Sequence, residues 1–252
     1  MVMPFVVNQD IRIRYEIEGH GPPLVLHHGF TGRLEMWRQL GYVDHLRKHF
    51  KLIMLDSRGH GESDKPHDVA AYALPNRVGD VVAILDALGI GQAHFFGYSM
   101  GGWIGFGMVR YAPERVRSLV IGGAHPYRDR TWEFFNKVTG DDTNKFLVAL
   151  EAVIEEQVPA LVRPLVLEND LQALVAAAQV RPALEDVPAK IKMPCLFFAG
   201  EEDSRFEAVK NCAAQVPTAR FISFPKLTHV ECFLRSDLLL PAISKFLSDS
   251  CA

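Results

Sequence analysis

The fold is decided by Ala93-His94-Phe95-Phe96-Gly97-Tyr98-Ser99-Met100-Gly101-Gly102. A short apolar run is followed by glycines and then by an apolar helical pattern. Three of its residues match G-x-S-x-G, a pattern in which the serine occupies a sharp turn from a strand into a helix. Such a turn exposes the hydroxyl and aims the first helical N–H groups at the atom that the hydroxyl attacks. The stretch predicts that Ser99 is a nucleophile, and a purely structural turn is the alternative.

Length and composition fit a large α/β domain, with or without an insertion. The chain has 252 residues, 48% of them hydrophobic and 23% charged. Its net charge is −3, and the basic residues are scattered along the chain. A nucleic-acid partner would need a basic block, so we expect none. We likewise expect no membrane partner, because no apolar run approaches the roughly 20 residues that span a bilayer.

Targeting and redox signals favour the cytoplasm. The start, residues 1–8, lacks the basic region and the long apolar run of a signal peptide. The four cysteines show neither metal-ligand spacing nor a dense disulfide framework. We therefore expect reduced thiols, no metal and no cofactor. The sequence does not indicate an oligomeric state.

Strands and helices alternate along most of the chain, which predicts a mostly parallel sheet of eight strands with helices on both faces. The predicted strands are Phe5–Val7, Ile11–Glu18, Leu24–His28, Leu52–Leu55, the run that enters Ser99, Val116–Ile121, Cys195–Ala199 and Phe221–Phe224. The predicted helices include one whose apolar stripe runs from Met36 to Phe50, and others over Val78–Leu88, Ala208–Val216 and Leu238–Leu247.

The pattern changes between residues 125 and 188, where helical spacing replaces strands. Asp141, Asp142 and Asn169 are candidate N-caps there, and prolines separate the helices. We expect residues 125–188 to form a small helical cap, and residues 1–124 and 189–252 to form the core.

A serine hydroxyl needs a base to accept its proton, and the base needs a carboxylate to orient it. His229 is the best base, in a loop just after the last predicted strand. Asp203 is the best acid, on the turn that follows Cys195–Ala199, with Glu202 in reserve. The resulting order is Ser–Asp–His. The N–H groups of Met100 and Phe30 are candidates for stabilising an oxyanion.

Five other residues attract attention. His125 follows a predicted strand and could contact a substrate, whereas Trp103 could either pack against the sheet or border the pocket. Both are candidate pocket residues. We interpret His27 and His28 as structural hydrogen-bonding groups and Cys232 as inert core.

Together these motifs resemble the α/β-hydrolase fold family. The segment His28-Gly29-Phe30 resembles its oxyanion loop, and Gly97–Gly102 resembles its G-x-S-M-G-G elbow. Residues 56–63 resemble a mainly structural D-x-R-G-x-G-x-S loop, and Gly200–Asp203 resembles the acid loop. The resemblance covers about residues 5–124 and 189–250. It implies the α/β-hydrolase fold, with a cap that roofs the site and sets substrate choice.

Departures from the family pattern narrow the chemistry. Thr228 replaces a common glycine before the histidine, and Val230 replaces the tryptophan frequent in carbon–carbon bond hydrolases. No proline follows Asp203, where Ser204-Arg205-Phe206 stands, and there is no H-G-G-G run, which disfavours bulky tertiary-alcohol esters. A serine at position 99 disfavours haloalkane dehalogenases and epoxide hydrolases, which have aspartate there.

The resulting hypothesis is a serine hydrolase acting on small to medium apolar carboxylic esters or lactones through an acyl-enzyme. A cofactor-free perhydrolase or haloperoxidase-like activity is an alternative, because the S-M-G-G-W stretch also resembles those enzymes. A carbon–carbon bond hydrolase and a non-catalytic ligand receptor are further alternatives.

Overall fold

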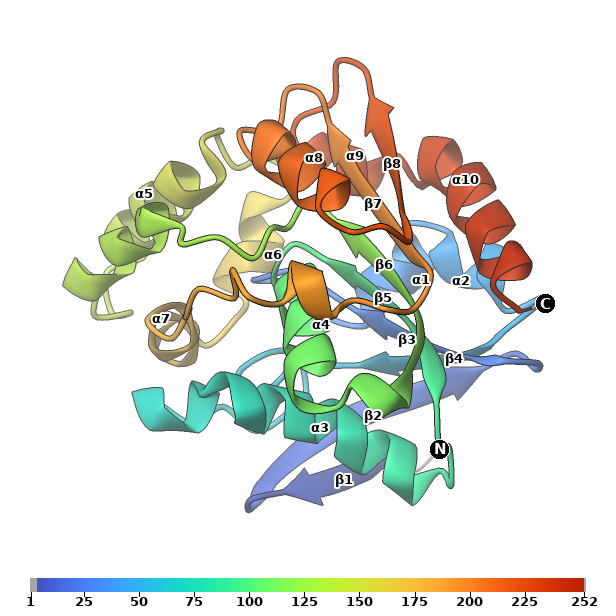
Figure 1. The fold of residues 1–252 in the computed structure, drawn as a ribbon. Helices are drawn as coiled ribbons and strands as arrows, with labels where there is room; N and C mark the ends of the chain where they lie inside the picture. Colours follow the sequence, from blue (N-terminus) through green and yellow to red (C-terminus); the bar gives the residue numbers. More distant parts are fainter. Residues whose placement is uncertain (1–3, 252) are drawn as a thin grey trace.

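A sheet of eight strands runs through the molecule in the order β1-β2-β4-β3-β5-β6-β7-β8 (Figure 1). The computed structural model describes residues 4–251, so Met1–Met3, the start of the stretch tested for a signal peptide, lie outside it. The strands are β1 (Phe5–Asn8), β2 (Ile11–Glu18), β3 (Pro23–His27), β4 (Lys51–Leu55), β5 (Ala93–Tyr98), β6 (Val116–Gly122), β7 (Cys195–Gly200) and β8 (Ala219–Phe224).

Strand direction follows the predicted mixture. Strands β1 and β2 pair antiparallel, as do β2 and β4, whereas β4, β3, β5, β6, β7 and β8 form a parallel series. The carboxyl ends of the six parallel strands therefore meet at one edge, where α/β sheets place their ligands. The predicted mostly parallel eight-stranded sheet is confirmed.

Helices cover both faces of the sheet (Figure 1). One face carries α3 (Leu74–Ala87), α4 (Met100–Tyr111) and α8 (Phe206–Ala214). The other face carries α1 (Glu35–Gln39), α2 (Tyr42–Leu46), α9 (His229–Leu234) and α10 (Ser236–Asp249). Across residues 4–251, none of the helices has both the length and the apolar character needed to traverse a membrane.

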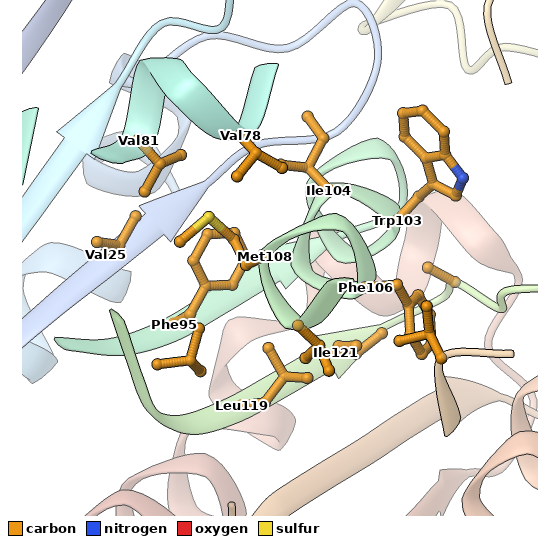
Figure 2. Close-up of a cluster of buried hydrophobic side chains, with 14 of the residues drawn as sticks. Val25, Val78, Val81, Phe95, Trp103, Ile104, Phe106, Met108, Leu119 and Ile121 are labelled. Carbon is orange, nitrogen blue, oxygen red and sulfur yellow. The ribbon is translucent and has the colours of Figure 1, made fainter. Parts of the chain in front are cut away.

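Helix α4 is the most deeply buried helix of the core. Every residue from Met100 to Val109 is buried, because α4 packs against β5 and β6 of the sheet and against α3 on the same face. Figure 2 shows Met108 of α4 with Val78 and Val81 of α3, beside Phe95 and Val25 of the sheet, and Trp103 at the edge of this cluster. The dense packing fixes the first turn of α4, which begins immediately after Ser99.

Between β6 and β7 the described chain contains helices and no strand. These are η3 (Arg130–Lys137), α5 (Thr143–Ile154), α6 (Arg163–Leu167), α7 (Leu171–Ala178) and η4 (Pro188–Lys190). A hydrophobic cluster of residues 132–178 joins η3, α5, α6 and α7, and Phe30 packs against it. The division at residues 125 and 188 stays a prediction, and we propose that this segment is the cap.

Three local predictions were wrong. The single helix from Met36 to Phe50 is two short helices, because Gly41 adopts a left-handed φ of 80° between them. Asp170, not Asn169, caps α7 by accepting a hydrogen bond from Ala173 N at 3.0 Å. Helix α9, which begins at His229, was missed because six residues give too short a periodic pattern.

The elbow glycines give a stability prediction. A Cβ at Gly101 would lie 2.1 Å from the carbonyl oxygen of His27. The methyl group of Gly101→Ala would therefore push α4 away from the end of β3. We expect the free energy of unfolding in urea to fall by about 1–3 kcal/mol or more. Gly91→Ala adds the same methyl with nothing within 4 Å, and should stay within about 1 kcal/mol of the wild type. Equal stability of the two variants would contradict the packing argument.

Candidate active site

Ser99 occupies a strained turn between β5 and α4. Its φ of 52° and ψ of −112° lie outside the regions that ordinary L-residues favour, a conformation that costs on the order of 1–3 kcal/mol. The neighbouring glycines explain how the turn closes. A Cβ at Gly97 would lie 2.3 Å from the backbone of Gly101, so no larger residue fits. The turn also holds Ser99 to the sheet, since its N–H donates to Gly122 O at 2.8 Å.

His229 was expected in a loop, but it is the first residue of α9. Thr228 caps this helix: its hydroxyl accepts from Glu231 N at 3.3 Å, and the Glu231 carboxylate accepts from Thr228 N at 3.1 Å. The capping box thus gives Thr228 a structural role. The Tyr98 hydroxyl, one residue before Ser99, donates to His229 O at 2.7 Å. The backbone of His229 is therefore tied to the elbow.

The structure brings Ser99, His229 and Asp203 into one hydrogen-bonded chain. His229 Nε2 lies 2.9 Å from Ser99 Oγ, and His229 Nδ1 lies 2.7 Å from Asp203 Oδ2. A carboxylate accepts only, so Nδ1–H donates to Asp203 and leaves Nε2 free to accept the serine proton. Glu202, the reserve acid, is exposed on the same turn, whereas Asp203 is buried.

Asp203 is held as an anion in a buried position. Burial by itself raises the pKa of this carboxyl, but the charge and hydrogen bond of His229, together with Arg205, outweigh burial and leave the pKa below its ordinary value. Arg205 contributes its backbone N–H at 3.0 Å and its guanidinium at 3.7 Å. The carboxylate therefore stays charged at neutral pH.

The two predicted oxyanion donors flank Ser99. Met100 is the first residue of α4, and the loop that carries Phe30 packs against the elbow, since a Cβ at Gly29 would lie 3.4 Å from Ser99 Cβ. In residues 4–251, the N–H groups of Phe30 and Met100 donate to no backbone carbonyl. Both groups are free to bind an oxygen of a substrate.

Ser99 borders two cavities of different character. The larger cavity, of about 110 Å³, is mostly apolar. It is lined by the loop at Phe30, by His229 and by side chains of α5 and α6. The second, of about 20 Å³, is mostly polar. It is lined by Ser99, Trp103, Gly123, Ala124, His125, Tyr127, Asp129, Arg181, Pro182 and Arg205. The two predicted pocket residues, His125 and Trp103, thus lie on the second cavity and not on the apolar one.

The other histidines near the elbow are structural. His28 Nε2 accepts from Ser57 N at 3.0 Å, and its Nδ1–H donates to Gly29 O at 2.7 Å. Burial lowers the pKa of His27 to about 3 and that of His28 to about 4, so both are neutral at pH 7. Burial raises the pKa of Cys232 to about 12, which keeps this thiol protonated and inert.

Sequence reasoning missed two arginines at the site. Arg181 comes from the segment between α7 and η4, and Arg205 from the turn before α8, and both line the polar cavity. Arg181 stands as a charge in a mostly apolar stretch, a signal that could have been noticed, whereas Arg205 lies in the charged stretch of residues 201–207 and gives no such signal. In the described part of the chain, no group of three or more His, Cys, Asp or Glu side chains is placed to hold a metal ion.

Comparison with known proteins gives the family. The model of the alpha/beta hydrolase fold matches residues 22–179. A Bacillus subtilis protein, provisionally named 2-succinyl-6-hydroxy-2,4-cyclohexadiene-1-carboxylate synthase, is 26% identical over 94% of this chain and 95% of its own. The 3-oxoadipate enol-lactonase 2 of Acinetobacter baylyi is 34% identical over 45% of this chain and 42% of its own. The solved structure of Est816, described as an N-acyl homoserine lactone degrading enzyme, is 26% identical over 96% of this chain and 100% of its own, with a TM-score of 0.78.

The match over more than half of the chain, on a sheet with this strand order and elbow, defines the class. The chain belongs to the α/β-hydrolase fold family and is an enzyme of that family. The predicted family and fold are confirmed.

The Asp203 carboxylate gives a prediction for acid stability. Its pKa in the folded protein lies below the unfolded value of about 3.9, so its stabilising effect is fully present above that value and is lost as the pH falls through the folded-state pKa. Urea unfolding between pH 6 and pH 2.5 should therefore show a steeper acid loss in the wild type than in Asp203→Asn. Glu202→Gln, in the same turn, should keep the wild-type slope. Parallel curves for all three proteins would contradict the assignment.

Proposed function

We propose that this enzyme is a serine hydrolase that cleaves carboxylic esters or lactones of small to medium apolar substrates. One observation carries the proposal: His229 lies within hydrogen-bond distance of both Ser99 Oγ and Asp203 Oδ2. This arrangement joins nucleophile, base and orienting acid in the order that acyl transfer requires. The roles below follow from it.

In the first half-reaction, Ser99 Oγ attacks the carbonyl carbon while His229 Nε2 accepts its proton. Asp203 holds the imidazole in the correct tautomer and stabilises the imidazolium that forms. The N–H groups of Phe30 and Met100 bind the oxyanion, and removing one such donor typically costs about 10²–10³-fold in kcat. His229 then protonates the leaving alkoxide, and the acyl group stays on Ser99.

In the second half-reaction, His229 accepts a proton from water, which attacks the acyl carbon. The collapse of the second tetrahedral intermediate breaks the bond to Ser99 Oγ, and the proton returns from His229 to the serine. The atoms balance as ester plus water giving acid plus alcohol. No cofactor is needed for any of these steps.

Substrate size and polarity follow from the larger cavity. Leu150, Val153, Ile154 and Val158 form part of its wall, and their apolar surface favours an apolar alcohol or acyl group. Two of the relatives support acyl transfer by name, since one is an enol-lactonase and the other degrades an N-acyl homoserine lactone. We also propose a cytoplasmic location, on the ground that all four cysteines are free thiols.

Hydrolysis of 4-nitrophenyl acetate and butyrate tests the proposal. Ser99→Ala should lower kcat/KM by about 10³-fold or more, because the nucleophile is lost while the oxyanion donors remain. Ser248→Ala, which removes an exposed hydroxyl from α10, should match the wild type. A fluorophosphonate should label the wild type at Ser99 and leave Ser99→Ala unlabelled.

The alternatives give different results in the same assays. Equal rates for wild type and Ser99→Ala would exclude the serine mechanism. Peracid formation from acetate and hydrogen peroxide, faster than ester hydrolysis, would favour the perhydrolase. Tight binding of an ester without release of product would favour a ligand receptor.

A further inference from the structure

The polar cavity beside Ser99 is lined by charged side chains, among them Arg181, that take no part in ester cleavage by Ser99, His229 and Asp203. Its volume of about 20 Å³ exceeds the 10–15 Å³ that one water molecule needs, so it can admit a small polar group. Ser99 and Arg205 border both this cavity and the apolar pocket. A substrate held at Ser99 therefore has access to both.

Arg181 is the unsatisfied cation of this cavity. Its guanidinium carbon lies 4.0 Å from the ring centre of Trp132 and 4.5 Å from that of Trp103. Its Nη1 is buried without a hydrogen-bond partner, and among residues 4–251 no carboxylate lies within 4.0 Å of it. Arg181 is half-buried overall, and stacking on the two rings compensates its charge only in part, so a direct pair with an anion is favourable.

The neighbouring side chains do not supply an ion pair to Arg181. Arg205 is 3.7 Å from the carboxylates of both Asp129 and Asp203, so its charge is compensated. His125 has a buried Nδ1 without a partner, and burial lowers its pKa to about 4, so it is neutral at pH 7 and available as a hydrogen-bonding group. Asp129 lines the same cavity, but its carboxylate pairs with Arg205, and no direct ion pair to Arg181 is formed within residues 4–251. A guanidinium without a direct ion pair, beside free hydrogen-bonding atoms, matches a carboxylate ligand.

We propose that Arg181 binds a carboxylate carried by the acyl part of the substrate, so that the preferred substrates are half-esters of short dicarboxylic acids with an apolar alcohol, or the corresponding acidic lactones. This inference rests on the proposed hydrolase function and refines its substrate class.

The position of His229 assigns the carboxylate to the acyl side. His229 protonates the leaving alcohol in the proposed mechanism, and it lines the apolar pocket but not the polar cavity. The alcohol therefore lies in the apolar pocket. The far end of the acyl chain then extends past Ser99 towards Arg181.

The test compares acidic and neutral esters of equal chain length. Monophenyl glutarate and monophenyl adipate are paired with phenyl pentanoate and phenyl hexanoate, and the spontaneous rate of each ester is subtracted. We expect the acidic member to have the higher kcat/KM by about tenfold or more, mostly through a lower KM, because a charge-assisted pair forms only with the acid.

Arg181→Met removes the charge and keeps an apolar stem between the tryptophans. The acid-to-neutral ratio of kcat/KM should fall to about one in this variant, and Arg181→Lys should restore part of it. The neutral ester reports any structural damage, because it makes no ion pair with Arg181. Arg128→Met is the matched control, since Arg128 is an exposed arginine of the same region that does not line the polar cavity, and it should keep the wild-type ratio.

Binding separates this inference from the hydrolase assignment. Ser99→Ala should bind monophenyl adipate in a calorimeter, and the additional Arg181→Met change should weaken that binding about tenfold or more. Binding that depends on Arg181, without hydrolysis by the wild type, would support the carboxylate site and refute the hydrolase. Hydrolysis of both esters at equal kcat/KM, with binding that ignores Arg181, would mean that the cavity holds water only and would overturn the inference.

Discussion

The close approach of α4 to the ends of β3 and β6 is the constraint on which the site depends. A Cβ at Gly101 would meet the carbonyl of His27, and one at Gly102 would lie 2.8 Å from Ala124 Cβ. Only glycine permits this contact, and the contact forces Ser99 into its positive φ. The cost of that strained turn is offset by the buried apolar surface of α4. Packing of the core therefore determines where the reacting hydroxyl points.

The same contact explains why the partners of Ser99 can come from distant parts of the chain. Asp203 follows β7 and His229 follows the neighbouring parallel strand β8. Their positions are set by the register of the sheet and by the N-capping residue Thr228 of α9. The hydrogen bond from Tyr98 holds the backbone of His229, and the one from the Arg205 N–H holds the Asp203 carboxylate. Positioning by rigid elements keeps the chain of three residues assembled before any substrate arrives.

Most of the fold could be predicted because its signals are local. Apolar runs, the elbow glycines and the strand–helix alternation each occupy a few consecutive residues, and they gave the sheet and its direction. The errors arose where tertiary contacts decide. A stripe from Met36 to Phe50 cannot show that Gly41 breaks the helix, and six residues after Thr228 are too few to show that α9 exists. For the site, the positions of Ser99, Asp203 and His229 follow from strand order, whereas the contacts of Arg181 join residues about fifty to eighty apart in sequence.

The two arginines beside Ser99 show why their roles must differ. Arg205 contacts Asp203 and Asp129, and its Nη2 donates to Val153 O, so its charge is used within the protein. Arg181 instead stacks on two tryptophan rings and forms no ion pair within residues 4–251, although both arginines keep a buried Nη1 without a hydrogen-bond partner. A position that only needed bulk could hold an apolar residue instead, since the half-buried guanidinium of Arg181 leaves a buried Nη1 without a hydrogen bond. Retaining a guanidinium at that position is physically reasonable if its partner is an anion that enters the cavity with the substrate.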